Sequence, residues 1–233
     1  MRVRGPMWQA WVPGRRRHRA RMRCVTLTVI DHPLASDLLR RLRDRTTGPA
    51  EFRALTRRLG TVLVVEATRD LGSREVEVET PLETATGRAL ERGLVAIPVL
   101  RAGLGLLDSV TDLYPDTVVG YLGMERDEIT LAPRDYYAKL PPMEERHALV
   151  LDPMLATGGS GSAACTYVKR ATPAAIAFVC VVAAPEGVAK MAEDHPDVSI
   201  VTAALDRGLN DQGFIMPGLG DFGDRLHGTA ERT

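Results

Sequence analysis

The chain has 233 residues, of which 45% are hydrophobic and 26% charged, as in an ordinary globular protein with room for a sizeable core. Its formal net charge of zero hides an asymmetry: residues 1–23 hold eight arginines and no acidic residue, which leaves 22 basic against 30 acidic residues in the remainder. An acidic body of this kind argues against a broad nucleic-acid-binding surface.

The arginine-rich residues 1–23 have three interpretations. They are a basic arm for an anionic surface, a targeting peptide, or a disordered extension that includes a misassigned start, with Met22 as the alternative initiator. The apolar core of a secretory signal is absent, and we favour the third interpretation. We therefore expect residues 24–233 to form a single domain.

Cysteine and histidine usage indicates a cytoplasmic protein without a metal bound by its own side chains. The three cysteines lack C-x-x-C spacing, which fits a reducing compartment, and Cys180 lies in an apolar run where a thiol is usually a small core side chain. The five histidines show no metal-ligand pairing. No apolar run approaches the roughly 18 residues of a membrane span.

The first half of the chain predicts two helices and a strand. The helices open near Pro33 and Pro49, both plausible first-turn prolines. Residues 74–80, REVEVET, alternate strictly between polar and apolar residues, which predicts a half-buried strand, plausibly antiparallel at the edge of a sheet.

From residue 94 onward, short apolar runs alternate with helical patterns. We predict strands at 94–100, 117–124, 147–152, 174–184 and 198–205, with helices from about 103, at 158–171 and at 185–195. Strands separated by helices indicate βαβ units and a largely parallel sheet. Residues 121–140 are more polar and alternate around a turn, which predicts a projecting hairpin.

Two of these strands end in residues suited to phosphate chemistry. Ligands of open α/β sheets bind at the carboxyl ends of strands. The strand 147–152 ends at Asp152, after which Thr157, Gly158, Gly159 and Ser160 open a helix whose amides and dipole fit a phosphate. No lysine follows these glycines, so the turn is not a Walker A loop. An aspartate just before such a cradle is suited to the hydroxyls of an attached sugar.

The second strand end, 94–100, leads into Arg101, Ala102 and Gly103. The guanidinium offers a forked cation to a diphosphate, and the small residues let the backbone approach closely before a helix.

The stretch MPGLGDFGDR, 216–225, contains a perfect G-x-G-x-x-G at Gly218, Gly220 and Gly223. A dinucleotide-binding fingerprint needs a strand before it, a helix after it and an acidic residue about 20 positions on. Only ten residues follow Gly223, so the chain is too short for that interpretation.

The motifs together resemble those of the type I phosphoribosyltransferases, and specifically the uracil phosphoribosyltransferases. The segment LVLDPMLATGGS resembles the ribose-phosphate signature of the class, with Pro153 as in the uracil-specific variant. DHPL, EATRDL, ETPLETATG, PVLRAGLGLLD, AAPEGV and DRGLNDQGFIMPGLGDFGDR follow in the family order, so the resemblance covers roughly residues 29–229.

The resemblance implies a parallel sheet flanked by helices, a projecting β-hairpin arm at about 121–140, and a small hood from the chain termini with a base-binding part at about 206–225. It implies that uracil and 5-phosphoribosyl 1-diphosphate (PRPP) give UMP and diphosphate, with Mg²⁺ carried on the diphosphate. A homodimer or higher homo-oligomer is expected. GTP activates some relatives, and the sequence leaves that question open.

By the same resemblance, particular residues are assigned to the two substrates. Those expected to bind PRPP are Arg101, Ala102, Gly103, Arg126, Asp152, Pro153, Met154, Leu155, Ala156, Thr157, Gly158, Gly159, Ser160 and Asp221. Those expected to line the uracil site are Ile215, Gly220, Asp221 and Phe222. Asp152, Arg101 and Asp221 are the candidate catalytic residues. Many relatives have a small residue in place of Phe222, so its bulk bears on the size of the pocket.

Two alternatives stay open on the sequence alone. One is a phosphoribosyltransferase for another base, against which the C-terminal motif argues. The other is a nucleotide-sensing RNA-binding regulator on the same fold, against which the acidic body argues.

Overall fold

The computed structural model describes residues 26–126 and 133–229. The strands are β1 (Leu27–Val29), β2 (Ser73–Glu79), β3 (Thr84–Leu90), β4 (Leu94–Leu100), β5 (Val118–Val119), β6 (Tyr121–Arg126), β7 (Pro133–Lys139), β8 (His147–Leu151), β9 (Met154–Leu155), β10 (Ala175–Ala183), β11 (Ser199–Leu205), β12 (Gly208–Leu209) and β13 (Ile215–Met216). The helices are α1 (Pro33–Arg43), α2 (Pro49–Ala67), α3 (Leu104–Leu113), α4 (Gly159–Arg170), α5 (Pro185–Asp194) and α6 (Phe222–His227).

The described residues build one large sheet in the order β1-β11-β10-β8-β4-β6-β7, with β5 beside β4 and β9 beside β10. The pairs β1–β11, β10–β11, β8–β10, β4–β8 and β4–β6 are parallel, and β6–β7 is antiparallel. The predicted parallel sheet with flanking helices and a hairpin at 121–140 is therefore confirmed. The hairpin tip, residues 127–132, lies outside the described residues.

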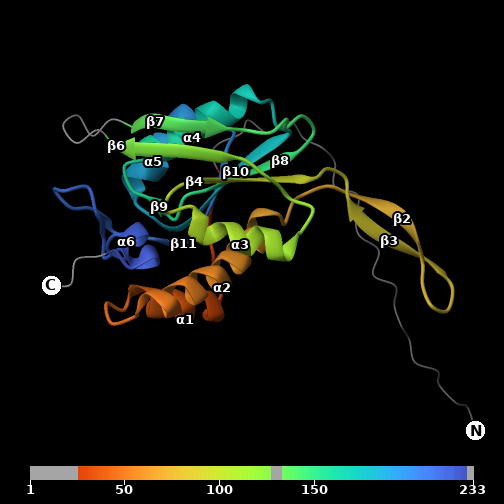
Figure 1. Cartoon of the computed structure of the whole chain (residues 1–233), viewed down its shortest axis with the longest axis horizontal. Coiled ribbons are helices and arrows are strands. Elements are labelled where there is room, and N and C mark those ends of the chain that lie inside the picture. Colours follow the sequence, from red (N-terminus) through yellow and green to blue (C-terminus); the bar gives the residue numbers. More distant parts are fainter. Residues whose placement is uncertain (1–25, 127–132, 230–233) are drawn as a thin grey trace, which may run out of the picture.

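Alternate residues of the central strands face two helical layers (Figure 1). Leu149 and Leu151 of β8 belong to the core that α1, α2 and α3 cover, whereas Ala148 and Val150 belong to the core under α4 and α5. The central strands are apolar throughout because both of their faces are buried. Pro33 and Pro49 stand in the first turns of α1 and α2, as predicted.

Both described cysteines are core residues, which confirms the prediction for Cys180. Burial raises the pKa of the Cys165 thiol to about 12 and that of Cys180 to about 12. These two thiols therefore stay protonated at neutral pH and are poor nucleophiles. None of the described helices combines the length and apolar character that a membrane span requires.

The alternating segment 74–80 differs from its prediction. It forms β2, which pairs antiparallel with β3 in a separate two-stranded ribbon that extends away from the body (Figure 1). Val76 is only partly buried and Val78 is exposed, so the segment is not a half-buried strand of the main sheet. The alternation predicted an antiparallel, two-faced strand correctly, but within residues 26–126 and 133–229 no further layer covers its apolar face.

Candidate active site

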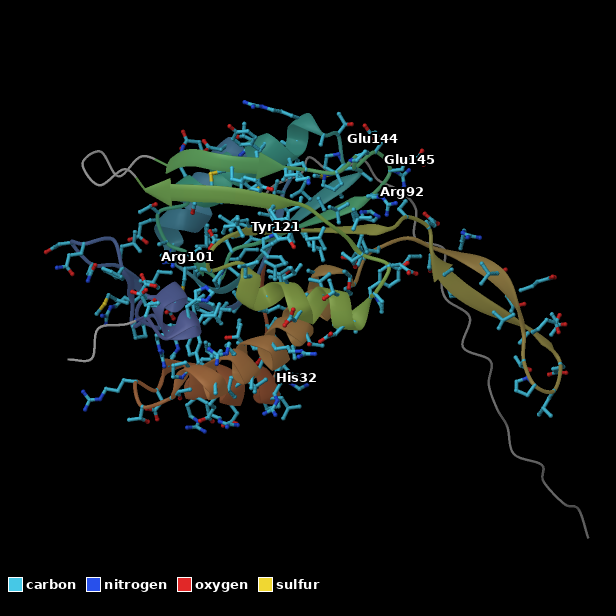
Figure 2. The ribbon with its side chains drawn as sticks, in the orientation of Figure 1. His32, Arg92, Arg101, Tyr121, Glu144 and Glu145 are labelled. Atoms are coloured by element: carbon cyan, nitrogen blue, oxygen red, sulfur yellow. The ribbon has the colours of Figure 1, made fainter. Side chains whose placement is uncertain are left out.

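The parallel pairing of β4 and β8 brings the two predicted strand ends together. Pro98 of β4 lies opposite Leu151 of β8, so Arg101 and Asp152 follow neighbouring strands at the same edge of the sheet. In Figure 2, Arg101 is labelled on the side of the molecule that carries α6, and Arg92, which precedes β4, on the opposite side. The carboxyl ends of the central strands therefore face the C-terminal segment.

Asp152 is held in place by hydrogen bonds of its backbone N–H and of its side-chain carboxylate. Its N–H donates to the Val179 carbonyl at 3.1 Å, which continues the β8–β10 pairing. Its Oδ2 accepts from the Ser160 hydroxyl at 3.2 Å, and its Oδ1 lies 3.4 Å from the Met154 N–H. The residue is only 8% exposed, so its carboxylate is fixed rather than freely rotating.

Thr157–Ser160 form a tight turn into α4. Gly158 is left-handed, with φ 82°, and as the N-cap of α4 it offers no side chain to the first amides of the helix. A Cβ at Gly158 would lie 2.8 Å from Lys190 Cβ and 2.9 Å from the Gly187 carbonyl oxygen of α5. Gly187 is itself required, because its own Cβ would lie 2.5 Å from the Ala156 carbonyl oxygen. The cradle is thus shaped from behind by α5, and its helix-terminal amides fit an anion.

The Arg101 turn packs closely against the backbone of β8. Arg101 is exposed and the Leu100–Arg101 peptide is cis. Gly103 is buried, and any Cβ there would overlap the Leu151 carbonyl oxygen of β8. α3 begins directly afterwards, so Arg101 stands at a rigid corner beside the end of β8.

The G-x-G-x-x-G segment has no βαβ unit around it, which agrees with its exclusion as a dinucleotide fingerprint. The two-residue strand β13 precedes it, and the short helix α6 follows. Gly218 and Gly220 have φ values of 59° and 75°, so both need glycine's freedom. Asp221 is the N-cap of α6, and its Oδ1 accepts from the Asp224 N–H at 2.9 Å.

A cavity of about 290 Å³ joins the strand ends to this loop. Predicted PRPP and uracil residues meet in its wall, which includes Ala102, Asp152, Met154, Ala156, Ile215, Gly220, Asp221 and Phe222. The volume suits a small ligand, and the wall combines apolar side chains with two carboxylates. The structure thus brings members of both predicted sets to one cavity.

The other predicted site residues lie outside that wall. The Pro153 and Leu155 carbonyls accept hydrogen bonds from the N–H groups of Val181, in β10, and Ala184, which directly follows β10, at 2.9 and 2.8 Å. The remaining residues belong to the two turns described above: Arg101, Gly103, Thr157, Gly158, Gly159 and Ser160. The side chain of Arg126 lies outside the described part of the structure. The assignment of substrates to all these residues stays a prediction.

Residues between β12 and β13 also line the cavity, and they were not singled out from the sequence. They are Gln212, Gly213 and Phe214. Asn210 organises the turn, because its Oδ1 accepts from the Gln212 and Phe214 N–H groups at 3.1 and 2.8 Å. An Asx turn in the run LNDQGF was the available signal.

Phe222 contributes to the cavity wall while its ring lies in the core. The residue is 2% exposed, and its ring meets that of Phe52 at 5.0 Å in an edge-to-face arrangement. A Cβ at Gly105 would lie 3.3 Å from the Phe222 ring, so this glycine makes room for it. The bulk of Phe222 is therefore absorbed between α2 and α3 instead of filling the cavity.

The structure has a mostly parallel sheet flanked by helices, with the Asp152 and Arg101 turns at the carboxyl ends of two neighbouring strands, which is the arrangement expected of the type I phosphoribosyltransferase class. The family model described as uracil phosphoribosyltransferase matches residues 29–229. This chain belongs to the uracil phosphoribosyltransferase family.

Individual relatives agree with that assignment. A uracil phosphoribosyltransferase of Dictyoglomus thermophilum is 49% identical over 203 residues, which cover 86% of this chain and 98% of that protein. One from Delftia acidovorans is 48% identical over 206 residues, covering 88% and 99%. A solved protein of Aquifex aeolicus superposes with a TM-score of 0.85 at 36% identity, over 89% of this chain and 100% of that one.

The placement of the two phenylalanines at the cavity gives a stability prediction. Phe222→Ala removes a buried ring and is expected to lower the free energy of unfolding by about 3–5 kcal/mol. Phe214→Ala, the control, removes an aromatic side chain that is 45% exposed, so its cost is expected to stay below about 1 kcal/mol. Denaturant unfolding measures both, and equal costs would contradict the core placement of Phe222.

Proposed function

We propose that the chain transfers the 5-phosphoribosyl group of PRPP to N1 of uracil, which yields UMP and diphosphate. The observation that carries the proposal is the cavity whose wall includes Asp152 on one side and Gly220 and Asp221 on the other. A sugar phosphate bound at the strand ends would present its C1 toward a base bound at the loop. Membership of the family supports the same reaction.

The 5′-phosphate binds at Thr157–Ser160. The left-handed Gly158 turns the backbone so that the first amides of α4 are available to phosphate oxygens, and the helix dipole favours the negative charge. The Thr157 side chain is near the same turn, with its Oγ1 3.5 Å from the Gly159 N–H. These groups fix one end of the sugar.

Asp152 binds the ribose hydroxyls. Its carboxylate is an acceptor, and the Ser160 bond keeps it directed along the turn. In the transition state the C1–O bond is largely broken and the ribose carries positive charge, as in other glycosyl transfers. A fixed carboxylate near the ring stabilises that charge more than it stabilises the neutral ground state.

Arg101 and Arg126 bind the departing diphosphate. Arg101 stands exposed at the corner after β4, where its planar guanidinium can engage two phosphate oxygens at once. As the C1–O bond breaks, its electron pair leaves with the diphosphate, and the arginine charge offsets the added negative charge. Mg²⁺ bound to the diphosphate would supply further charge there, and Asp152 offers the carboxylate oxygen that this hard cation prefers.

Uracil binds against the glycine loop and Ile215. Ile215 is 3% exposed and closes the floor, while the backbone of Gly220–Phe222 offers donors and acceptors to the edge of the base. A base with the wrong edge leaves buried groups unpaired, which penalises it. Asp221 is the carboxylate on this side, and we propose that it accepts the N1 proton as the N1–C1 bond forms.

The experiment is UMP formation from uracil and PRPP with Mg²⁺, compared with cytosine, hypoxanthine and adenine. We expect uracil to exceed each of the others by at least about 10³-fold in kcat/KM. Turnover of another base with none of uracil would overturn the proposal.

In the same assay Asp152→Asn tests the site. Loss of a charge directed at the transition state is expected to lower kcat by about 10²-fold, or about 2.7 kcal/mol. Asp197→Asn is the matched control, since Asp197 pairs with Lys169 on the surface at 2.5 Å. An Asp152→Asn variant as active as the control would remove Asp152 from the mechanism.

We also propose that the protein is a homodimer in which the β2–β3 ribbon packs against the second copy. An isolated two-stranded ribbon is marginally stable in water. Here one face carries Val76 and Val78, and Leu82 at the tip is 96% exposed. These apolar groups support burial against another surface.

Val78→Glu places a charge on that face and is expected to raise the dimer dissociation constant by at least about 10-fold, because the charge loses water on burial. Glu77→Gln on the opposite face is the control. Analytical ultracentrifugation over a concentration series measures both variants. A wild-type chain that sediments as a monomer at every concentration would refute the dimer.

A further inference from the structure

Asp206 and Arg43 bind both backbone groups of one residue of the glycine loop, Gly218. Arg43, in the last turn of α1, donates to both oxygens of the Asp206 carboxylate at 2.9 and 2.6 Å. The Gly218 N–H donates to Asp206 Oδ2 at 3.0 Å, and the Gly218 carbonyl accepts from Arg43 at 2.8 Å. Asp206 is 8% exposed, so the ion pair is largely removed from water, and hydrogen bonds satisfy both of its carboxylate oxygens.

Arg225 fastens the next residue of the loop to the same end of α1. Its Nη1 donates to the carbonyls of Leu219 and Leu42 at 2.8 and 2.6 Å, and its Nη2 donates to the Asp44 carbonyl at 2.6 Å. Leu42 and Asp44 lie at the C-terminal end of α1, where carbonyls lack helical partners and favour a cation. The guanidinium also stacks 4.5 Å from the centre of the Phe52 ring.

These contacts act on a segment that glycine would otherwise leave loose. Gly218 and Gly220 both adopt positive φ, and glycine loses more backbone freedom on ordering than any other residue. The residues that follow the fastened pair, Gly220 and Asp221, line the cavity, whereas neither Arg43 nor Arg225 does. The two arginines are therefore placed behind the loop and act on it through its carbonyls.

We propose that Arg225 and the Arg43–Asp206 pair are positioning residues for the base: they hold residues 218–221 in the binding conformation before the base arrives. The conformational entropy of the loop is then lost during folding and not on binding, so the affinity for the base is higher. The identity of the base rests on the proposed function, whereas the fixing of the loop does not. Because Arg225 serves three carbonyls with one planar fork, lysine cannot replace it in full.

The test compares Arg225→Lys, Arg225→Gln and Arg43→Lys with the wild type. The control is Arg69→Gln, because Arg69 forms an exposed ion pair with Glu66 three residues earlier, at 2.5 Å, away from the glycine loop. With saturating PRPP, we expect KM for uracil to rise at least 10-fold in Arg225→Gln and less in the two lysine variants. KM for PRPP should stay within twofold, and the control should match the wild type.

Hydrogen exchange on the ligand-free protein gives an independent readout. Amides of residues 218–221 should exchange at least 10-fold faster in Arg225→Lys than in the wild type, while those of β8 and α4 stay unchanged. Unchanged exchange in the loop overturns the proposal, as does an equal rise in KM for both substrates, which indicates general loosening. A wild type that makes no UMP would refute the proposed function, and the exchange result would still decide this inference.

Discussion

The parallel pairing of β4 with β8 is the constraint on which the site depends. It sets Pro98 opposite Leu151, and from that register Arg101 and Asp152 emerge side by side. The contact is close enough that Gly103 has no room for a Cβ against the Leu151 carbonyl. α3 and the turn into α4 both begin at this edge, so a shift in register would separate the two turns assigned to PRPP.

The two halves of the candidate site are built in different ways. The half assigned to the phosphate comes from one continuous stretch, Asp152–Ser160, closed by a hydrogen bond over eight residues. The half assigned to the base combines the two ends of the chain, because Arg43 reaches Asp206 across 163 positions. The first half can form with its own βα unit, whereas the second exists only when the whole chain has folded.

This difference explains what the sequence could predict. The strands, the Asp152 turn and the Arg101 corner follow from local apolar runs and glycines, and the structure has them at those positions. The bonds of Arg43 and Arg225 leave no periodic signal, because most of their partners, the Asp206 carboxylate and the carbonyls of Gly218, Leu42 and Asp44, are remote from them in the chain. The sequence also could not predict where the Phe222 ring points, because the space that it occupies is formed by Phe52 and Gly105, which are distant in the chain. The short run at 84–90 gave no strand prediction, because β3 is ordered mainly by pairing with β2.

The row of glutamates on β2 has a consequence for a protomer that has just folded. In the part of the chain that the structure describes, each strand of the ribbon pairs on one side only, and an unpaired strand edge is a template for the addition of further strands. Glu75, Glu77 and Glu79 repeat along one face of β2, and their like charges oppose the stacking of one ribbon on another. A folded protomer is therefore expected to resist stacking on its glutamate face, while the valine face opposite carries no such row of like charges.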